Sequence, residues 1–303
     1  MKRFSVRFYQ IAVLLLLMLS SPSCTGDPAE ERSRFMKRGD IYFASQEFRK
    51  ALLEYKKAVQ AEQGYAKAHY QLAITYLTTG QTRLALEEFE KTIGIDPENL
   101  DAQLKLGQFY LATRRTKDAK AKAVFVLERE PENIEALFLK MSVLLQAGNL
   151  SESTRILKHI AELDNKNTRA LVSLARIAES KKQFAAAKRY LAKAIEANPE
   201  NPSINLEFAR FHEQHGDLEE AEKEFKNAVS IKPDDASIMA QLGNFYARHG
   251  NTNEAEQTYL KMVEMAPDSM GPKMTIGIFY ASQQNWPQAE EWMQKALDLQ
   301  PEN

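Results

Sequence analysis

Cysteine is almost absent from this chain of 303 residues: Cys24 stands alone, so neither an intrachain disulfide framework nor a cysteine-rich zinc site can form. Glycine and proline are also scarce, at 12 and 11 residues, which argues against a turn-rich β protein. Acidic and basic residues nearly cancel to a net charge of −1, so we expect no attraction by bulk charge to nucleic acid or to an anionic membrane.

The amino end has the pattern of an export signal. Lys2 and Arg3 precede nine apolar residues at 11–19, a run too short to span a bilayer comfortably. Small residues then lead to Cys24, and the whole arrangement resembles a bacterial lipoprotein signal. The resemblance implies that residues 1–23 are a signal peptide, that Cys24 carries lipid, and that residues 24–31 are a tether. Ordinary cleavage after Ser23 and an uncleaved anchor are the alternatives; all three export the rest of the chain.

The remainder of the chain is an internal repeat. The tripeptide Pro-Glu-Asn occurs at 97–99, 131–133, 199–201 and 301–303, with gaps that are multiples of 34 residues. A fixed period of this size is typical of a solenoid built from repeated supersecondary units. Residues 32–303 divide without insertion or deletion into eight blocks: 32–65, 66–99, 100–133, 134–167, 168–201, 202–235, 236–269 and 270–303.

Equivalent positions of the blocks predict two helices and two turns in each. Position 8 is usually Gly or Ala and position 20 is Ala in seven blocks, so the two helices can approach closely. Proline stops most second helices, and the residue that ends a block favours the start of the next helix as an N-cap. Gly at position 15 suits the turn inside a block. The expected caps are Asn99, Asn133, Asn167, Asn201, Asp235 and Ser269.

These features resemble the tetratricopeptide repeat (TPR) over residues 32–303. The resemblance implies an all-α fold, a right-handed superhelical α-solenoid of eight TPR helix pairs. The fourth block departs most from the pattern, with Met141, Ser153 and Asn165 in place of a small residue, alanine and proline, so we expect an altered turn there.

The TPR resemblance also implies that positions 2, 5, 9, 12 and 13 of the first helices line a concave groove. The groove is expected to be apolar in blocks 2 to 4 and to carry arginine in blocks 5 to 7. Two interpretations stay open: the side chains anchor a bound segment, or they pack and form ion pairs with Glu179 and Glu213 inside the protein. The candidate groove residues are Tyr70, Ile74, Leu77, Leu104, Leu111, Phe138, Leu145, Arg176, Arg210 and Arg248.

No pattern of catalytic residues stands out. The motifs GxxxxGK(S/T), GxGxxG, HExxH and GxSxG do not occur. His212 and His215 have the spacing of a metal pair on a helix, but His215-Gly216 and His249-Gly250 are equivalent helix ends, where histidine favours the negative end of the helix dipole. We therefore expect no enzyme, no cofactor and no bound metal.

The expected function is a non-catalytic scaffold that is tethered to a membrane of the bacterial cell envelope, faces the periplasm and binds a protein or peptide. Resemblance to TPR lipoproteins of envelope assembly implies settings such as secretion, pilus biogenesis or exopolysaccharide export. The alternatives are a carbohydrate-binding module and the docking arm of a longer protein. No capping helix follows the last block. Either the chain is the front part of a longer array, or a partner or self-association covers the last face, near Trp292, Leu297 and Leu299.

Overall fold

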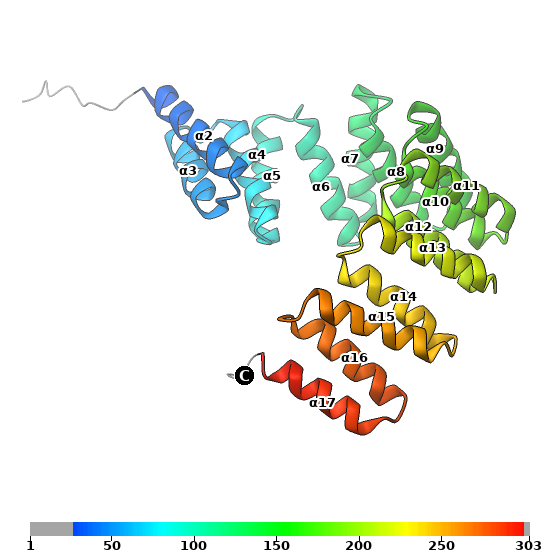
Figure 1. The fold of residues 1–303 in the computed structure, drawn as a ribbon. Helices are drawn as coiled ribbons and strands as arrows, with labels where there is room; N and C mark the ends of the chain where they lie inside the picture. The colour runs from blue at the N-terminus through cyan, green and yellow to red at the C-terminus, as the bar shows by residue number, and fades with distance from the viewer. Residues whose placement is uncertain (1–26, 300–303) are drawn as a thin grey trace, which may run out of the picture. The chain divides into compact units, whose positions relative to one another are not determined.

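The computed structural model describes residues 27–299, and every regular element in that range is an α-helix (Figure 1). Consecutive helices pair in the order that the repeat predicts, with a first and a second helix in each block. The first helices are α2 (Pro28–Ala44), α4 (Ala66–Thr78), α6 (Leu100–Ala112), α8 (Ile134–Gln146), α10 (Thr168–Ser180), α12 (Pro202–Gln214), α14 (Ala236–Arg248) and α16 (Met270–Ser282). The second helices are α3 (Phe48–Ala61), α5 (Thr82–Ile95), α7 (Thr116–Arg129), α9 (Leu150–Leu163), α11 (Phe184–Ala197), α13 (Leu218–Ile231), α15 (Thr252–Met265) and α17 (Trp286–Leu297).

The chain divides into two compact units, which meet between Val143 and Leu144 inside α8. In the first unit, one core runs through the helix pairs from Met36 to Val143. In the second unit, the largest core cluster joins the last three helix pairs, and smaller clusters lie under α10 to α12. Each unit is therefore a stack of helix pairs, as a TPR solenoid requires.

Small residues let the two helices of a pair approach closely. Ala51, Ala85 and Ala221 are completely buried where the second helix faces the first. A Cβ atom on Gly39 would lie 2.5 Å from Cε1 of Tyr55, so glycine is needed wherever the facing residue is tyrosine. Repeats with alanine at this place carry a smaller facing residue, as in Ala73 with Phe89. In these repeats the sizes of the two facing side chains are thus matched, whereas in the third repeat Leu139 of the next repeat lies against Gly107.

The helix starts confirm most of the expected caps. The side chain of Asn99 accepts a hydrogen bond of 2.9 Å from the backbone N–H of Ala102, and Asp235 accepts two such bonds. Ser269 makes no side-chain cap, so that prediction was wrong. The first helix also begins at Pro28, four residues before the block boundary, because Asp27 accepts from the N–H of Ala29 and Pro28 suits a first turn. Residues 28–31, expected to be part of a tether, are therefore helical.

The turn that follows the fourth repeat is regular, contrary to expectation. The N–H of Asn167 donates to the carbonyl oxygen of Asp164 over 3.0 Å, as Asn99 donates to Asp96 in the second repeat. The Asp164 side chain also accepts from the N–H of Lys166, so an aspartate turn forms without proline. Cys24 and the predicted signal peptide lie outside the described residues.

Candidate functional site

The first helices of the first unit carry a stretch of half-buried apolar side chains. Ile74 and Leu77 of α4 and Leu111 of α6 pack on the core and keep part of their surface exposed. Tyr70 is also half-buried, and its ring packs edge-on against Phe89 with the ring centroids 5.9 Å apart. We call Tyr70, Ile74, Leu77 and Leu111 the apolar stretch.

Two candidate groove residues are buried instead. Leu104 keeps 6% of its surface exposed and Phe138 only 1%, so both belong to the interior of the helix stack. This is the alternative that the sequence left open for position 5, and it removes both residues from any open surface. Leu145 of α8, just inside the second unit, is half-buried.

The candidate arginines all form ion pairs within the protein. Arg176 lies 2.5 Å from Glu207 of the next first helix, and Arg210 lies 3.2 Å from the same carboxylate. Arg248 contacts Glu213 through two of its nitrogens, each 3.0 Å from a carboxylate oxygen. The sequence had suggested Glu213 as a partner, whereas Glu207 was not anticipated. An incoming carboxylate would have to displace these internal partners.

The histidines at the ends of α12 and α14 join the same charged surface. Nδ1 of His215 lies 2.6 Å from the carbonyl oxygen of Phe211 in the last turn of its helix, as the helix-end interpretation predicts. Its ring also lies 3.8 Å from Glu179 of the preceding repeat, and Nε2 of His249 lies 2.9 Å from Glu213. The same pairing, of glutamate at position 12 with histidine at position 14 of the next repeat, therefore occurs at two consecutive interfaces between repeats.

A cavity of about 280 Å³ opens on the first helices of the last two repeats. Ile278 projects from α16 at its edge with 57% of its surface exposed, and Met274, one turn earlier, is exposed as well. The floor contains Tyr259, whose hydroxyl group donates a hydrogen bond of 2.7 Å to Oδ1 of Asn244. We call this the Ile278 cavity, and its lining is Asn244, Ala247, Tyr259, Thr275, Ile278, Phe279 and Ser282.

The Ile278 cavity was not predicted from the sequence, although a signal was present. Met274 and Ile278 occupy positions 5 and 9 of the last block, the positions that Tyr70 and Ile74 occupy in the second block. The same spacing therefore marks an apolar surface at both places. Here the side chains are more exposed, because Ala247 at position 12 of the neighbouring helix is small and leaves space between them.

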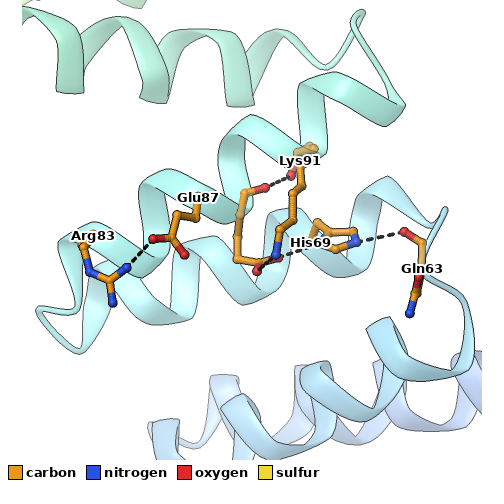
Figure 2. Close-up of polar contacts among 7 residues, drawn as sticks. Gln63, His69, Arg83, Glu87 and Lys91 are labelled. Atoms are coloured by element: carbon orange, nitrogen blue, oxygen red, sulfur yellow. Dashed lines mark hydrogen bonds and ion pairs between the residues drawn. The ribbon is translucent and has the colours of Figure 1, made fainter.

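A largely buried polar cluster lies between the two helices of the second repeat (Figure 2). Nδ1 of His69 lies 2.5 Å from Glu88, and its Nε2 lies 3.0 Å from the carbonyl oxygen of Gln63. Lys91 donates to the other oxygen of Glu88 over 2.7 Å. The hydrogen bond to Glu88 raises the pKa of His69. Burial opposes ionisation of Glu88, yet the hydrogen bonds from His69 and Lys91 lower the pKa of that carboxyl group.

This cluster has a structural role, because equivalent pairs occur in other repeats. Gln103 and Lys122 lie 2.7 Å apart at the same two positions of the third repeat, and Asn205 and Glu224 lie 2.7 Å apart in the sixth. Each pair satisfies polar groups that are buried between the two helices of one repeat. Nothing distinguishes His69 from these neighbours as a catalytic residue.

Among residues 27–299, no group of three or more His, Cys, Asp or Glu side chains is placed to hold a metal ion. Within the same range, no helix has the length and apolar character needed to cross a membrane.

Comparison with protein families agrees with this architecture. Models described as "Tetratricopeptide repeat" match residues 178–242, 214–270 and 70–123, and one described as "TPR repeat" matches residues 39–80. Together they cover more than half of the chain. The chain belongs to the tetratricopeptide repeat family, whose members in general are non-catalytic scaffolds. The fold is compatible with binding a protein or a peptide. No curated protein matches the chain in sequence.

Several solved structures share the fold at low sequence identity. Yeast Tom70 superposes with a TM-score of 0.67 at 17% identity over 92% of this chain and 62% of its own. A tetratricopeptide repeat protein from Parabacteroides merdae ATCC 43184 gives 0.63 at 14% identity over 88% and 99%. PilF of Pseudomonas aeruginosa gives 0.56 at 19% identity over 68% and 94%. At these identities the likeness establishes the fold alone.

Proposed function

We propose that the protein is a non-catalytic scaffold whose first helices bind a segment of another protein. The observation that carries the proposal is the Ile278 cavity, where an exposed isoleucine borders an unfilled space beside a small residue, Ala247. Burial of an exposed apolar side chain is favourable by about 25 cal/mol per Å². An aliphatic side chain of the bound segment fits this space. The side-chain NH2 of Asn244 offers a donor to its backbone, and the oxygens of Thr275 and Ser282 offer acceptors, because their hydroxyl groups already donate to the carbonyl oxygens of Gly271 and Phe279.

The apolar stretch on α4 and α6 offers a separate contact surface for a bound segment within the first unit. Ile74, Leu77 and Leu111 each leave part of an aliphatic side chain uncovered. The paired arginines contribute differently, because Arg176, Arg210 and Arg248 already have carboxylate partners. We therefore propose that apolar contacts supply most of the affinity, and that the ion pairs hold neighbouring first helices in register.

Carbohydrate binding has less support than protein binding. Sugar rings stack on exposed aromatic faces, but Phe138 is buried and Tyr70 packs against Phe89. Phe43, the other aromatic residue on this surface, packs edge-on against Phe48 with the centroids 5.4 Å apart. The first helices of the first unit therefore offer no row of free aromatic faces among the described residues.

Selection from a displayed library of random peptides tests the proposal and requires no identified partner. Enriched peptides are expected to carry aliphatic side chains, and their dissociation constants are then measured for the wild-type protein and for variants. Ile278→Ser is expected to weaken binding by roughly tenfold, because one buried aliphatic contact is lost. Leu53→Ser on α3 is the matched control, since Leu53 is similarly exposed but lies on a second helix. Peptides that bind both variants equally well would argue against the site.

We further propose that a lipid on Cys24 holds the scaffold at a membrane of the bacterial envelope, facing the periplasm. The basic start, the short apolar run and the small residues before Cys24 support this proposal. A single acyl chain binds a membrane weakly, whereas the several chains of a bacterial lipoprotein hold it stably. Cys24→Ala is expected to move the protein from the membrane fraction to the soluble fraction. An unchanged distribution would contradict lipidation.

The proposed setting is envelope assembly, secretion, pilus biogenesis or exopolysaccharide export, which the resemblance of the signal and the repeats to envelope lipoproteins supports. Self-association through the last repeat is part of the proposal, and the exposure of Leu297 supports it. A cross-linking experiment in envelope preparations, compared between wild type and Ile278→Ser, distinguishes partners held by the first helices from other contacts. Identical cross-linked products would contradict binding at the cavity.

A further inference from the structure

Position 10 of each repeat packs against the repeat that precedes it. The ring of Phe245 lies 5.1 Å from that of Phe225 in the preceding repeat, and the ring of Phe279 lies 5.2 Å from that of Tyr259. Position 10 is buried or half-buried in the second to eighth repeats. In the first repeat it is Ile41, and 64% of its surface is exposed. Ile41 therefore occupies an interface position but has no preceding repeat to pack against.

Position 28 packs against the repeat that follows it. Val229 lines one cavity together with Met239 and Leu242 of the next repeat, and Val263 is buried. The corresponding residue of the eighth repeat is Leu297, and 60% of its surface is exposed. Ile41 and Leu297 thus belong to the two opposite sides of an interface that consecutive repeats form along the chain.

A hydrogen bond at the same interface shows the same complementarity. The hydroxyl group of Tyr246 donates to Glu222 over 2.8 Å, and that of Tyr280 donates to Glu256 over 2.6 Å. In both pairs a tyrosine at position 11 reaches a glutamate at position 21 of the preceding repeat. The first repeat has Tyr42 at position 11 and the eighth has Glu290 at position 21.

Within the described residues, the hydroxyl group of Tyr42 and the carboxylate of Glu290 have no hydrogen-bond partner. Tyr42 contacts a charged group only through the ring, with Nζ of Lys50 at 5.3 Å from its centroid. A donor therefore lies in the first repeat and its matching acceptor in the eighth. The apolar residues Ile41 and Leu297 and the polar residues Tyr42 and Glu290 therefore match the same interface between consecutive repeats. The exposure of Leu297 alone would not establish this match.

We propose that two copies of this chain associate head to tail. The front face of one copy (Ile41 and Tyr42) packs on the rear face of the other (Glu290, Met293 and Leu297) and reproduces the interface between consecutive repeats. Tyr42 donates to Glu290 of the second copy, and Ile41 packs on Met293, which stands at the position of Phe225 and Tyr259. The contact is heterologous, so every copy offers one front and one rear face. The inference rests on the proposed scaffold function, which includes self-association through the last repeat. It identifies the first repeat as the surface that the last repeat contacts.

Sedimentation velocity of the purified full chain over a concentration series tests the proposal. The wild-type protein is expected to form species larger than a monomer as the concentration rises. Ile41→Glu and Leu297→Glu are each expected to abolish this association, because each places a charge in an apolar contact. An equimolar mixture of the two variants is expected to give a one-to-one dimer, since one variant keeps its rear face and the other its front face.

Tyr42→Phe is expected to weaken association by roughly tenfold through loss of a hydrogen bond to a charged group. Leu218→Glu is the matched control: Leu218 is also exposed but lies in the sixth repeat, which belongs to neither face, so the association of this variant is expected to equal that of the wild type. All variants carry the same amino-terminal residues, so association through that segment appears equally in each. Circular dichroism confirms that each variant is folded.

Three results would overturn the proposal: a monomeric wild type at every concentration, association that survives Ile41→Glu, or a variant mixture that stays monomeric. If the variant mixture stays monomeric and association is lost in Leu297→Glu alone, the contact is a symmetric one between two rear faces. Failure here is distinguishable from failure of the proposed function, because Ile41 and Leu297 lie outside the Ile278 cavity. Peptide binding by the Ile41→Glu variant measures the scaffold function separately.

Discussion

The hydroxyl group of Tyr259 donates a hydrogen bond of 2.7 Å to Oδ1 of Asn244. On the edge of the same ring, Cε1 lies so near Gly243 that a Cβ atom there would be only 2.5 Å from it. The first repeat has the same three-residue arrangement in Tyr55, Asp40 and Gly39. One tyrosine thus both fixes the distance between two helices and supports the floor of the Ile278 cavity.

The Gly243–Tyr259 contact predicts a non-additive pair of substitutions. Gly243→Ala is expected to lower the free energy of unfolding by about 1–3 kcal/mol, because the added methyl group overpacks the ring. Tyr259→Phe is expected to cost about 1 kcal/mol through the lost hydrogen bond. The double variant recreates the alanine–phenylalanine pair of Ala209 and Phe225, so its cost is expected to be less than the sum. Urea denaturation of all four proteins measures the coupling, and strict additivity would contradict the size-matching argument.

The turn inside each repeat predicts a stabilising substitution. Lys182 adopts φ of 57° at the position where Gly216 has φ of 82° in the next repeat, and a side chain disfavours this left-handed conformation. Lys182→Gly is therefore expected to raise the free energy of unfolding by about 1 kcal/mol. Lys181→Gly is the control, because Lys181 has φ of −87° and gains nothing from glycine. Thermal unfolding compares the two, and equal shifts would refute the explanation.

The His69–Glu88 pair predicts a window of pH in which it stabilises the protein. The raised pKa of His69 means that its contribution is complete below the ordinary value of 6.5 and is lost as the pH rises through the raised value. The lowered pKa of Glu88 means that its contribution is complete above 4.5 and is lost as the pH falls through the lowered value. His69→Gln is therefore expected to destabilise the protein most between pH 4.5 and 6.5.

Unfolding by urea across a pH series, with wild type and variant side by side, measures this window. His159→Gln is the control, since His159 is exposed and lies no closer than 3.9 Å to Glu162. A difference between wild type and His69→Gln that is independent of pH would show that the histidine acts through packing alone.

The caps predict unequal effects of similar substitutions. Asn99→Ala removes an acceptor for the N–H of Ala102 and is expected to cost about 1 kcal/mol. Ser269→Ala removes no cap hydrogen bond and is expected to change the free energy of unfolding by less than half as much. Hydrogen exchange at the first turns of α6 and α16 gives the local readout, and equal effects would contradict the assignment of the caps.

The fold could be predicted from the sequence because the same local residue preferences recur from repeat to repeat. Small residues face each other inside the helix pairs, Asn99 and its equivalents start helices, and Gly80 and its equivalents take φ near +75° in the turns. These requirements act within one block of 34 residues, so the chain repeats most of them from block to block. The start of α2 at Pro28 escaped prediction because it depends on Asp27, outside the period.

The candidate site was harder to predict because it depends on how neighbouring repeats meet. Periodicity places Leu104, Phe138 and Ile278 on the same side of their helices, but the adjacent side chains decide which of them is covered. The choice of Glu207 as the partner of Arg176 likewise depends on the rotation between two repeats. The sequence of a single block contains neither the neighbouring side chains nor the rotation between repeats. The exposure of these residues and the partner of Arg176 therefore had to come from the structure.

The most direct test of the central claim is the affinity of library-selected peptides for variants of the two first-helix surfaces. Binding at these surfaces predicts a loss of tenfold or more in Ala247→Trp, which fills the Ile278 cavity, or in Leu77→Ser combined with Leu111→Ser, which removes aliphatic anchors. Leu53→Ser is expected to bind like the wild type. Unchanged affinity in both groove variants, with every protein folded, would contradict segment binding by the first helices.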